Sequence, residues 1–265
     1  MEQTTQYAII TRDLTKTFGR GPKTITAVDH LNLRVLPGTL YGFLGPNGAG
    51  KTTTLKMLTG LLRPTGGTAI VAGFDVVQDP LEVKRRIGVV PETLHLYERL
   101  TADEYLELVG RLYSLDLETI RRRREQLLEG LDLADAADNM IVDYSHGMKK
   151  KLSLAAALLH RPQILFLDEP FEGVDAVSAR VIKDLLTRMA VNRGVTIFFS
   201  THIMELVERL CDRVAIINKG KLIAEGDLTS LRDQVSVTGD ASLEEVFLQL
   251  VEAKLGVHSL DWLFE

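Results

Sequence analysis

Cysteine and long apolar runs are what this sequence most clearly lacks. Cys211 is the single cysteine among 265 residues, which excludes an intramolecular disulfide framework and fits a reducing compartment. No run approaches the roughly 18–20 apolar residues that a membrane-spanning helix needs. The first residues also lack the basic segment followed by an apolar one that marks a signal peptide. We therefore expect a soluble, cytoplasmic protein, for which any role at a membrane requires a partner.

An excess of basic charge is also absent. The formal net charge is −5, so no overall basic field favours nucleic acid, and we expect no nucleic-acid partner. With 45% hydrophobic and 25% charged residues, the composition is that of an ordinary globular protein. The length allows one large domain or two small ones, and it is enough to bury a core without metal or disulfide support.

What the sequence does contain is a glycine-rich loop, GPNGAGKTT, at residues 45–53. It fits the phosphate-loop pattern Gly-x-x-x-x-Gly-Lys-[Ser/Thr]. Glycines let the backbone form a concavity whose N–H groups point at anionic oxygens. Lys51 adds a positive charge for the β- and γ-phosphates, and the Thr52 hydroxyl can bind Mg²⁺. We assign nucleotide binding to the loop residues Asn47, Gly48, Ala49, Gly50, Lys51, Thr52 and Thr53.

The surroundings of the loop support this assignment over a purely structural turn. A short apolar strand at 40–44 precedes the loop, and a helix at 52–61 follows it with its N-terminal dipole toward the phosphates. The loop alone does not separate ATP from GTP, or a motor from a kinase. Residues 218–221, Asn-Lys-Gly-Lys, partly match the guanine-reading pattern Asn-Lys-x-Asp but lack its Asp, which disfavours a GTPase.

The remaining pattern predicts strands and helices in a characteristic order. The first part is rich in β-structure, with strands expected at 7–15, 31–35, 67–73 and 87–90. Residues 101–133 have a helical pattern instead. Strands at 164–167, 195–200 and 213–218 then alternate with helices, which implies a largely parallel sheet. The sequence thus predicts an α/β fold with a helical insert, and a separate tail with one amphipathic helix at about 243–251.

A second motif is an apolar strand that ends in two acids, Asp168 and Glu169. In phosphate-loop enzymes a carboxylate at such a strand end supports the Mg²⁺, and Asp168 suits this role. Glu169 would emerge near the γ-phosphate, where a carboxylate can orient and deprotonate the attacking water. An acidic turn that caps a helix is the competing interpretation, and the presence of the phosphate loop in the same chain disfavours it.

Between these motifs lies the segment YSHGM at residues 144–148. Ser145 is a sound N-cap for a helix rich in Leu and Ala, and a helix N-terminus with a small residue such as Gly147 is also an anion site. With its motifs in this order, the sequence resembles the nucleotide-binding subunit of an ATP-binding-cassette (ABC) transporter over nearly its whole length. The segment stands where that family carries its signature, Leu-Ser-Gly-Gly-Gln; the chain departs from it at Tyr144, His146 and Met148.

The resemblance implies a P-loop NTPase (RecA-like) core with an N-terminal antiparallel β subdomain and an inserted α-helical subdomain. We expect a single ABC ATPase domain at 1–233, with its core at about 1–92 and 157–233 and its helical insert at about 93–156. A short C-terminal helical extension would follow at 234–265.

The family also implies a site shared between two chains. Two such domains pack head to tail, with each ATP between the phosphate loop of one and the signature of the other. Ser145 and Gly147 would contact the γ-phosphate of the partner's ATP, and Asp175 would cross the dimer seam, a role compatible with capping the following helix. Glu169, His202 and Lys51 are the expected catalytic residues. His202 matches the switch histidine that hydrogen-bonds the γ-phosphate and helps to position Glu169, although a lone histidine is usually structural.

Three further expectations concern single positions. Phe18 matches the aromatic residue that stacks on adenine, with Val28 beside it; an ordinary core aromatic is the alternative. Glu92 stands where the family usually has a Gln that senses Mg²⁺ and links the ATP state to the membrane subunit. Because Glu92 adds a negative charge, we expect altered Mg²⁺ affinity or coupling. The expected metal ligands are Thr52, Glu92 and Asp168.

Two charge runs are interpreted as solvent-exposed. Residues 121–124 are all arginine and have acidic neighbours in the same helical region, so a solvated helix face is favoured over nucleic acid or lipid headgroups. The lysine run at 149–151 lies on the signature helix and is also interpreted mostly as solvated charge.

Taken with the family, these features imply an ATPase that binds ATP and Mg²⁺ and dimerises with an identical or closely related subunit. It would drive a separate integral membrane permease from the inner face of the cell membrane. Glu92, the variant signature and residues 242–247 resemble the branch that serves export permeases for drugs or polysaccharides. A soluble ABC ATPase acting on DNA or ribosomes is the second hypothesis, which one cassette, one Cys and no sustained heptads disfavour. A regulator that binds nucleotide without hydrolysis is the third, which Asp168, Glu169 and His202 argue against.

Overall fold

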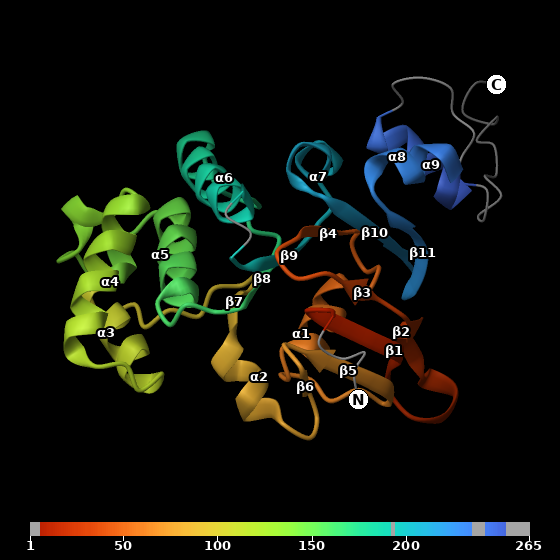
Figure 1. Cartoon of the computed structure of the whole chain (residues 1–265), viewed down its shortest axis with the longest axis horizontal. Helices are drawn as coiled ribbons and strands as arrows, with labels where there is room; N and C mark the ends of the chain where they lie inside the picture. Colours follow the sequence, from red (N-terminus) through yellow and green to blue (C-terminus); the bar gives the residue numbers. More distant parts are fainter. Residues whose placement is uncertain (1–5, 192–193, 235–241, 253–265) are drawn as a thin grey trace.

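The computed structural model describes residues 6–191, 194–234 and 242–252, and it arranges them as two β-sheets and several groups of helices (Figure 1). The strands are β1 Ile9–Phe18, β2 Ile25–Leu31, β3 Arg34–Val35, β4 Leu40–Leu44, β5 Gly66–Val71, β6 Phe74–Asp75, β7 Ile87–Val90, β8 Ile164–Asp168, β9 Thr196–Thr201, β10 Arg213–Asn218 and β11 Lys221–Gly226. The α-helices are α1 Lys51–Leu58, α2 Pro80–Arg86, α3 Ala102–Leu112, α4 Leu117–Gly130, α5 His146–Leu158, α6 Ala176–Val191, α7 Met204–Leu210, α8 Leu228–Gln234 and α9 Leu243–Glu252.

The larger sheet has the strand order β11-β10-β4-β9-β8-β7. All neighbouring strands in it are parallel except β11, which forms an antiparallel hairpin with β10. Strands β4 and β8 are buried along their whole length, as expected of central strands covered on both faces. The predicted α/β fold with a parallel sheet is therefore confirmed.

The hairpin between β10 and β11 explains the partial guanine-reading pattern. Asn218 pairs with Lys221 across the turn, and the two residues between them, Lys219 and Gly220, have φ of 47° and 80°. Positive φ at both central positions is the geometry of a tight hairpin turn. The Asn-Lys-Gly-Lys segment thus has a structural explanation.

The smaller, N-terminal sheet is antiparallel, with the order β2-β1-β5-β6 and β3 on the free part of β1. The predicted strand at 31–35 is not continuous: Leu31 ends β2, and β3 holds two residues. The Thr11 hydroxyl lies at the break, where it donates to Leu31 O at 2.8 Å and accepts from Leu33 N at 2.8 Å. The alternation itself is confirmed, because Leu31, Leu33 and Val35 are all buried.

Helices α3, α4 and α5 stand at one end of the molecule (Figure 1). Helix α3 begins with a capping box in which Thr101 and Glu104 each accept from the other's backbone N–H, at 3.1 and 3.0 Å. The arginine run on α4 is only partly solvated, which corrects the sequence-based interpretation. Arg124 pairs with Asp103 of α3 at 2.8 Å, and Arg123 donates to the Leu159 carbonyl at 2.8 Å. These two arginines therefore join α4 to its neighbours.

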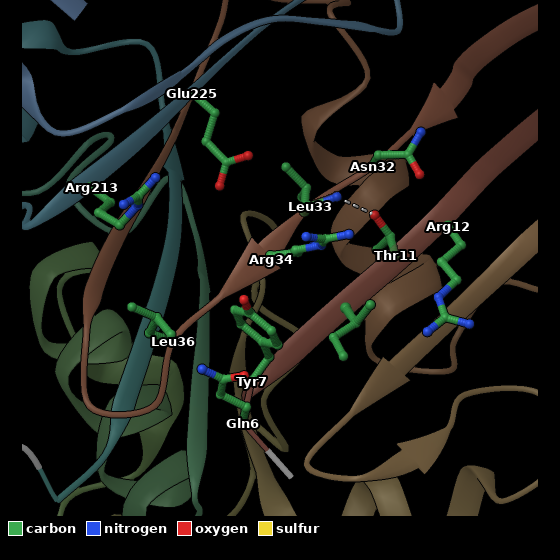
Figure 2. A pocket seen from close by; sticks show the side chains of 11 residues that line it. Gln6, Tyr7, Thr11, Arg12, Asn32, Leu33, Arg34, Leu36, Arg213 and Glu225 are labelled. Carbon is green, nitrogen blue, oxygen red and sulfur yellow. Dashed lines mark hydrogen bonds between the residues drawn. The ribbon is translucent and has the colours of Figure 1, made fainter. Parts of the chain in front are cut away.

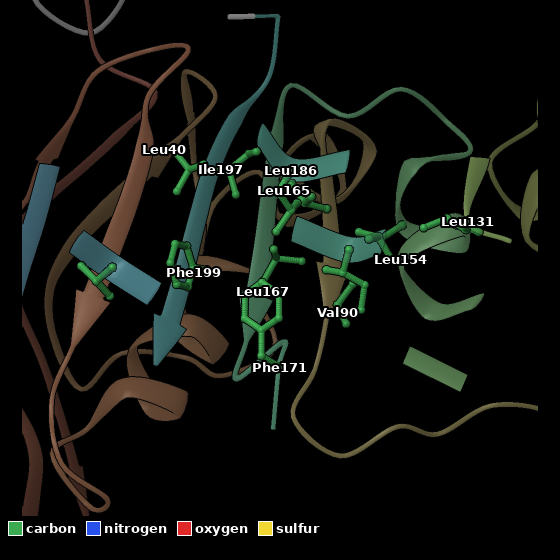
Figure 3. Close-up of a cluster of buried hydrophobic side chains, with 14 of the residues drawn as sticks. Leu40, Val90, Leu131, Leu154, Leu165, Leu167, Phe171, Leu186, Ile197 and Phe199 are labelled. Atoms are coloured by element: carbon green, nitrogen blue, oxygen red, sulfur yellow. The ribbon is translucent and has the colours of Figure 1, made fainter. Parts of the chain in front are cut away.

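The main sheet divides the core into two clusters, one on each face. Because successive side chains of a strand point to opposite faces, Leu165 and Leu167 join the first cluster with α5 and α6, as Figure 3 shows. Phe166 joins the second, which packs against α1 and the N-terminal sheet. There the Phe166 and Phe43 rings lie 5.6 and 5.3 Å from the ring of Phe198. The strands that carry the site are thus fixed from both sides.

The predicted amphipathic helix near the C-terminus is confirmed as α9. Its residues Leu243, Val246 and Phe247 are buried in the first core cluster, and Leu243 N donates to the Glu208 carboxylate of α7 at 2.8 Å. The rest of the expected extension, 235–241 and 253–265, lies outside the described residues, as do residues 1–5. Among the described residues, none of the helices combines the length and the apolar character of a membrane span.

Candidate functional site

The sequence motifs meet at one edge of the main sheet because β4, β9, β8 and β7 are parallel neighbours. Their carboxyl ends therefore lie together, the usual place for a ligand in an open α/β sheet. The phosphate loop follows β4, His202 follows β9, Glu169 follows β8, and Glu92 follows β7. Four segments that are far apart in the sequence thus contribute to one site.

The phosphate loop has two glycines that no other residue could replace. A Cβ at Gly45 would lie 2.3 Å from the Ile217 carbonyl oxygen. Gly50 has a φ of 107°, and its Cβ would lie 2.4 Å from the Ala27 carbonyl oxygen. Both contacts are with backbone of neighbouring segments, which cannot move aside cheaply. The loop encloses a cavity of about 270 Å³ lined by Ala27, Pro46, Asn47, Gly48, Gly50, Lys51, Thr52, Thr53, Glu92 and Glu169.

Glu169 lies between two basic side chains. Lys51 Nζ is 3.2 Å from Glu169 Oε1, and both side chains are only 6% exposed. His202 Nδ1 is 3.2 Å from Glu169 Oε2. The contact with Lys51 is electrostatic and lacks the alignment of a hydrogen bond; Lys51 donates instead to the Gly45 carbonyl at 2.7 Å. The predicted catalytic residues Lys51, Glu169 and His202 are therefore brought into one cluster.

Backbone conformation and a neighbouring hydroxyl fix the two acids at the end of β8. Glu169 has a φ of 46°, a left-handed conformation that is uncommon for a residue with a side chain and is often found at functional sites. Its backbone N–H donates to the Ser200 carbonyl of β9 at 3.1 Å. The Ser200 hydroxyl donates to Asp168, which is 4% exposed. Sequence reasoning gave Ser200 no role, although it directly precedes Thr201 and His202.

The expected metal ligands supply oxygen atoms only. The Thr52 hydroxyl lies 3.5 Å from Glu92 Oε2, so the loop after β7 reaches the first turn of α1. Among the described residues there is no group of three His, Cys, Asp or Glu side chains that could cage a metal. A hydroxyl and carboxylates without a full protein cage fit Mg²⁺, which binds through one or two protein oxygens, water and substrate phosphates.

Ser145, Gly147 and Asp175 form a second group, and none of them lines the phosphate-loop cavity. Ser145 caps α5 by accepting from Met148 N at 3.2 Å. Asp175 accepts from Val177 N and Ser178 N at 3.0 and 2.9 Å at the start of α6, and the bond from Ser178 lowers the pKa of its carboxyl. A Cβ on Gly147 would lie 2.5 Å from Asp175 Oδ2. The capping interpretation thus holds for both residues, and the two helix starts are in contact.

Phe18 and Val28 lie in different environments. Phe18 is 43% exposed at the end of β1, with Lys16 Nζ 5.2 Å from its ring centre, so the alternative of an ordinary core aromatic is wrong. Val28 is fully buried, and its Cγ2 would lie 3.4 Å from a Cβ on Gly50. In this structure Val28 packs beside Gly50 of the phosphate loop and has no exposed surface to offer a base.

The interpretation of the lysine run at 149–151 as solvated charge is wrong for two of its three residues. Lys149 is partly exposed and pairs with Glu98 at 2.6 Å. Lys150 and Lys151 are 2% and 4% exposed. Because α5 packs between the sheet and the other helices of the insert, side chains on most of its circumference are buried. Their burial depends on the distant segments that α5 packs against, which the local sequence does not reveal.

Other hollows lie away from the predicted site residues. One of about 740 Å³ lies where β1 and β3 face β10 and β11, and Figure 2 shows Arg34, Arg213 and Glu225 around it. Glu225 accepts from the Tyr41 hydroxyl at 2.8 Å, and burial raises the pKa of its carboxyl. A groove of about 330 Å³ runs between β7 and the helices α3 and α5; Pro91 and Leu96 are among its mainly apolar lining residues.

Comparison with known proteins gives one consistent answer. The family model described as ABC transporter matches residues 28–172. The chain is 40% identical over 237 residues to the daunorubicin/doxorubicin resistance ATP-binding protein DrrA of Streptomyces peucetius. The aligned region covers 87% of this chain and 72% of that protein.

Solved structures agree in fold. The chain is similar to the ATP-binding subunit of an ABC transporter, with a TM-score of 0.83 and 31% identity over 92% of this chain and 99% of that one. It is also similar to an ATP-binding cassette in a dimeric post-hydrolysis state bound to ADP and Pi, with a TM-score of 0.77 and 25% identity over 83% of this chain and 98% of that one.

Proposed function

This chain belongs to the ABC transporter family, and from that premise we propose that the cluster at the sheet edge hydrolyses ATP to drive a separate membrane permease. The family membership makes the chain an ATP-binding subunit with ATPase activity that works as a dimer. The proposal concerns which residues perform this activity. The observation that carries it is the position of Glu169, between Lys51 and His202 and beside the phosphate-loop cavity.

In the proposed reaction, Glu169 is the general base. Water attacks the γ-phosphorus, a new P–O bond forms, and the bond to the oxygen that bridges the β- and γ-phosphates breaks. The carboxylate of Glu169 accepts the proton from the water. His202 donates to a γ-phosphate oxygen and keeps Glu169 oriented through the contact of 3.2 Å. Lys51 exchanges its contact with Glu169 for the phosphates, whose negative charge it and the loop N–H groups stabilise.

The same residues fit a magnesium ion held mainly by the nucleotide. Thr52 and Asp168 would hold it, with Glu92 close enough to Thr52 to respond to it. When bound, the ion neutralises charge on the β- and γ-phosphates. Asp168 is kept in place by the Ser200 hydroxyl, so its carboxylate needs little reorganisation.

We further propose that Ser145, Gly147 and Asp175 act on the ATP of a second subunit. The start of α5 combines a serine N-cap with a buried glycine, and backbone N–H groups at a helix start favour an anion. These residues are absent from the lining of the chain's own phosphate-loop cavity. Their contact with the start of α6 means that Asp175 and the signature would reach the dimer seam together.

For the permease, we propose the apolar groove beside β7 as its binding site. Pro91 lines this groove, and the next residue, Glu92, lines the phosphate-loop cavity. A permease segment bound there would therefore touch the loop that faces the nucleotide. An amphipathic segment with an acidic residue fits best, because Lys84 and His95 stand among the apolar lining residues.

Leu61→Asp changes an exposed side chain of the groove (66% exposed) and should reduce co-purification with the permease. Leu112→Asp, at a residue that is 73% exposed and outside the groove, should not.

Association with the permease would place the chain on the inner face of the cell membrane. The similar protein from Streptomyces peucetius is named for resistance to daunorubicin and doxorubicin, and on this basis we propose export of an organic compound chosen by the permease.

Equal recovery of the permease with Leu61→Asp and with the unmodified subunit would refute the groove as the permease's binding site.

The experiment that tests the proposed site compares two variants. Lys51→Ala should bind a fluorescent ATP analogue poorly, because it removes the buried phosphate-facing cation. Glu169→Gln should bind it normally and should accumulate ATP-dependent dimers, detected by light scattering. If Glu169→Gln failed to bind ATP, or dimerised no more than the unmodified chain, Glu169 would be part of the binding surface and not the base.

A further inference from the structure

Lys150 is a buried lysine that the proposed mechanism does not use. It lies one turn into α5 and is 2% exposed. Its ammonium group donates to three backbone carbonyls: Glu92 O at 3.1 Å, Pro91 O at 3.3 Å and Glu169 O at 3.4 Å. A lysine ammonium has three N–H donors, so all of them have an acceptor in the protein.

The three carbonyls belong to the two loops that matter most to the proposed site. Pro91 and Glu92 follow β7, and Glu169 follows β8. Each loop carries one carboxylate that faces the phosphate-loop cavity. The ammonium of Lys150 therefore ties both loops together from a position outside the lining of the phosphate-loop cavity.

Charge around Lys150 is one-sided. Asp168, Glu172, Glu92 and Glu169 all act on its ammonium as nearby negative charges, while burial lowers the pKa of Lys150. The family usually carries a neutral Gln at this position, so Glu92 adds one carboxylate to the cluster. A cation buried behind such a cluster offsets part of its negative field, and this effect is strong where water is excluded.

We propose that Lys150 is a positioning residue that fixes the Glu92 loop against the Glu169 backbone and supplies the positive charge that compensates the carboxylate of Glu92. The inference rests on the proposed function, because it takes Glu169 as the base and Glu92 as the metal-sensing residue. It also explains why a lysine occupies this buried position: an apolar side chain of the same length would remove the donor of the Pro91 and Glu92 carbonyls. It would also remove one positive charge from beside four carboxylates.

The neighbouring residue provides a matched control. Lys151 is also buried, at 4% exposed, and its ammonium donates to the Asp132 carbonyl at 3.0 Å within the helical insert. It contacts neither the Glu92 loop nor Glu169. Lys151→Met therefore reproduces the loss of a buried lysine on α5 without touching the site.

The test uses three substitutions at position 150 in the full-length chain. Lys150→Met removes both donors and charge, Lys150→Gln keeps donors but removes the charge, and Lys150→Arg keeps both. The proposal expects kcat of Lys150→Met to fall by about tenfold to a hundredfold, as for other small misplacements of reacting groups, with Lys150→Gln and Lys150→Arg less affected. Amide exchange of residues 91–98 should accelerate in Lys150→Met and stay near normal in Lys151→Met.

The charge is tested without hydrolysis, in the Glu169→Gln background. The Mg²⁺ concentration that gives half-maximal binding of a fluorescent ATP analogue should fall by about threefold to tenfold in Lys150→Gln, because a positive charge near the cation is lost. Adding Glu92→Gln should return it toward the starting value. Lys151→Met should leave it unchanged.

The outcomes separate the inference from the proposed function. If the unmodified chain releases phosphate normally but Lys150→Met and Lys150→Gln match Lys151→Met in kcat, loop exchange and Mg²⁺ dependence, the inference is overturned and the function stands. If Lys150→Met does not fold, Lys150→Gln alone decides. A shift in the Mg²⁺ dependence of Lys150→Gln that Glu92→Gln does not reverse would contradict the compensating charge. Failure of the proposed function would show instead as unaltered hydrolysis by Glu169→Gln.

Discussion

Gly147→Ala tests the proposal that each nucleotide is shared by two chains. The new Cβ would lie 2.5 Å from both Asp175 Oδ2 and Ser178 Oγ and 2.9 Å from Ser178 Cβ. Ser178 is buried, at 6% exposed, so its side chain cannot swing into solvent. The methyl group must therefore push the start of α6 away from the start of α5.

The expected cost follows from these contacts. Overpacking a buried site costs about 1–3 kcal/mol, and the displaced Asp175 would also move away from the two N–H groups that it caps. For a chain of this size, the overpacking should lower Tm by roughly 2–12 °C. A Cβ on Gly130, at the end of α4, would meet nothing within 4 Å, so Gly130→Ala is the control and should leave Tm unchanged or slightly raised.

The functional readout separates the two halves of the site. In the Glu169→Gln background, Gly147→Ala should bind the ATP analogue with normal affinity at protein concentrations where the chain is monomeric, because Gly147 does not line the chain's own phosphate-loop cavity. Its ATP-dependent dimerisation, followed by light scattering, should be weakened by at least about tenfold (about 1.4 kcal/mol), because the clash displaces the starts of α5 and α6 that are proposed to reach the second subunit. Equal losses in monomer binding and dimerisation, or no loss in dimerisation, would refute the shared site.

Three further substitutions test separate parts of the structure. Phe18→Ala should weaken binding of the ATP analogue by about fivefold to a hundredfold without lowering Tm, since stacking on an exposed ring is worth about 1–3 kcal/mol; unchanged affinity would remove Phe18 from the site. Thr101→Ala should lower the free energy of unfolding by about 0.5–2 kcal/mol through loss of the capping box, and a urea titration that gives no difference would contradict its role. Burial raises the pKa of Glu225 above its ordinary value of 4.5, so the folded chain holds this proton more tightly than the unfolded chain, and stability is lost as pH rises above 4.5. Glu225→Gln should therefore raise Tm at about pH 7 and have little effect near pH 3.5, and the opposite pH dependence would show that the carboxylate is stabilised in the fold.

The parts of the site that the sequence predicts are those whose chemistry follows from a few adjacent residues. The phosphate loop needs glycines at Gly45 and Gly50 because backbone of other segments comes within 2.3 and 2.4 Å of where a Cβ would stand. That requirement leaves a spacing that can be recognised in the chain. The acids Asp168 and Glu169 are recognisable for a similar reason, since they follow four apolar residues directly and Asp168 is the last residue of β8.

Contacts between distant segments could not be predicted in this way. Lysine is usually a surface residue, and only the folded chain brings Lys150 to Pro91, Glu92 and Glu169. At the break between β2 and β3, the backbone groups of Leu31 and Leu33 bond to the hydroxyl of Thr11, which lies on a different strand. The arginine run has a similar explanation, since the Asp103 that binds Arg124 belongs to another helix.

The most direct test of the central claim is phosphate release from ATP by the purified chain and by Glu169→Gln, measured with and without Mg²⁺. We predict Mg²⁺-dependent release by the unmodified chain and a rate at least about a hundredfold lower in Glu169→Gln, the contribution expected of a general base. Comparable release by the two proteins would contradict the assignment of Glu169 and, with it, the account of how this cluster works.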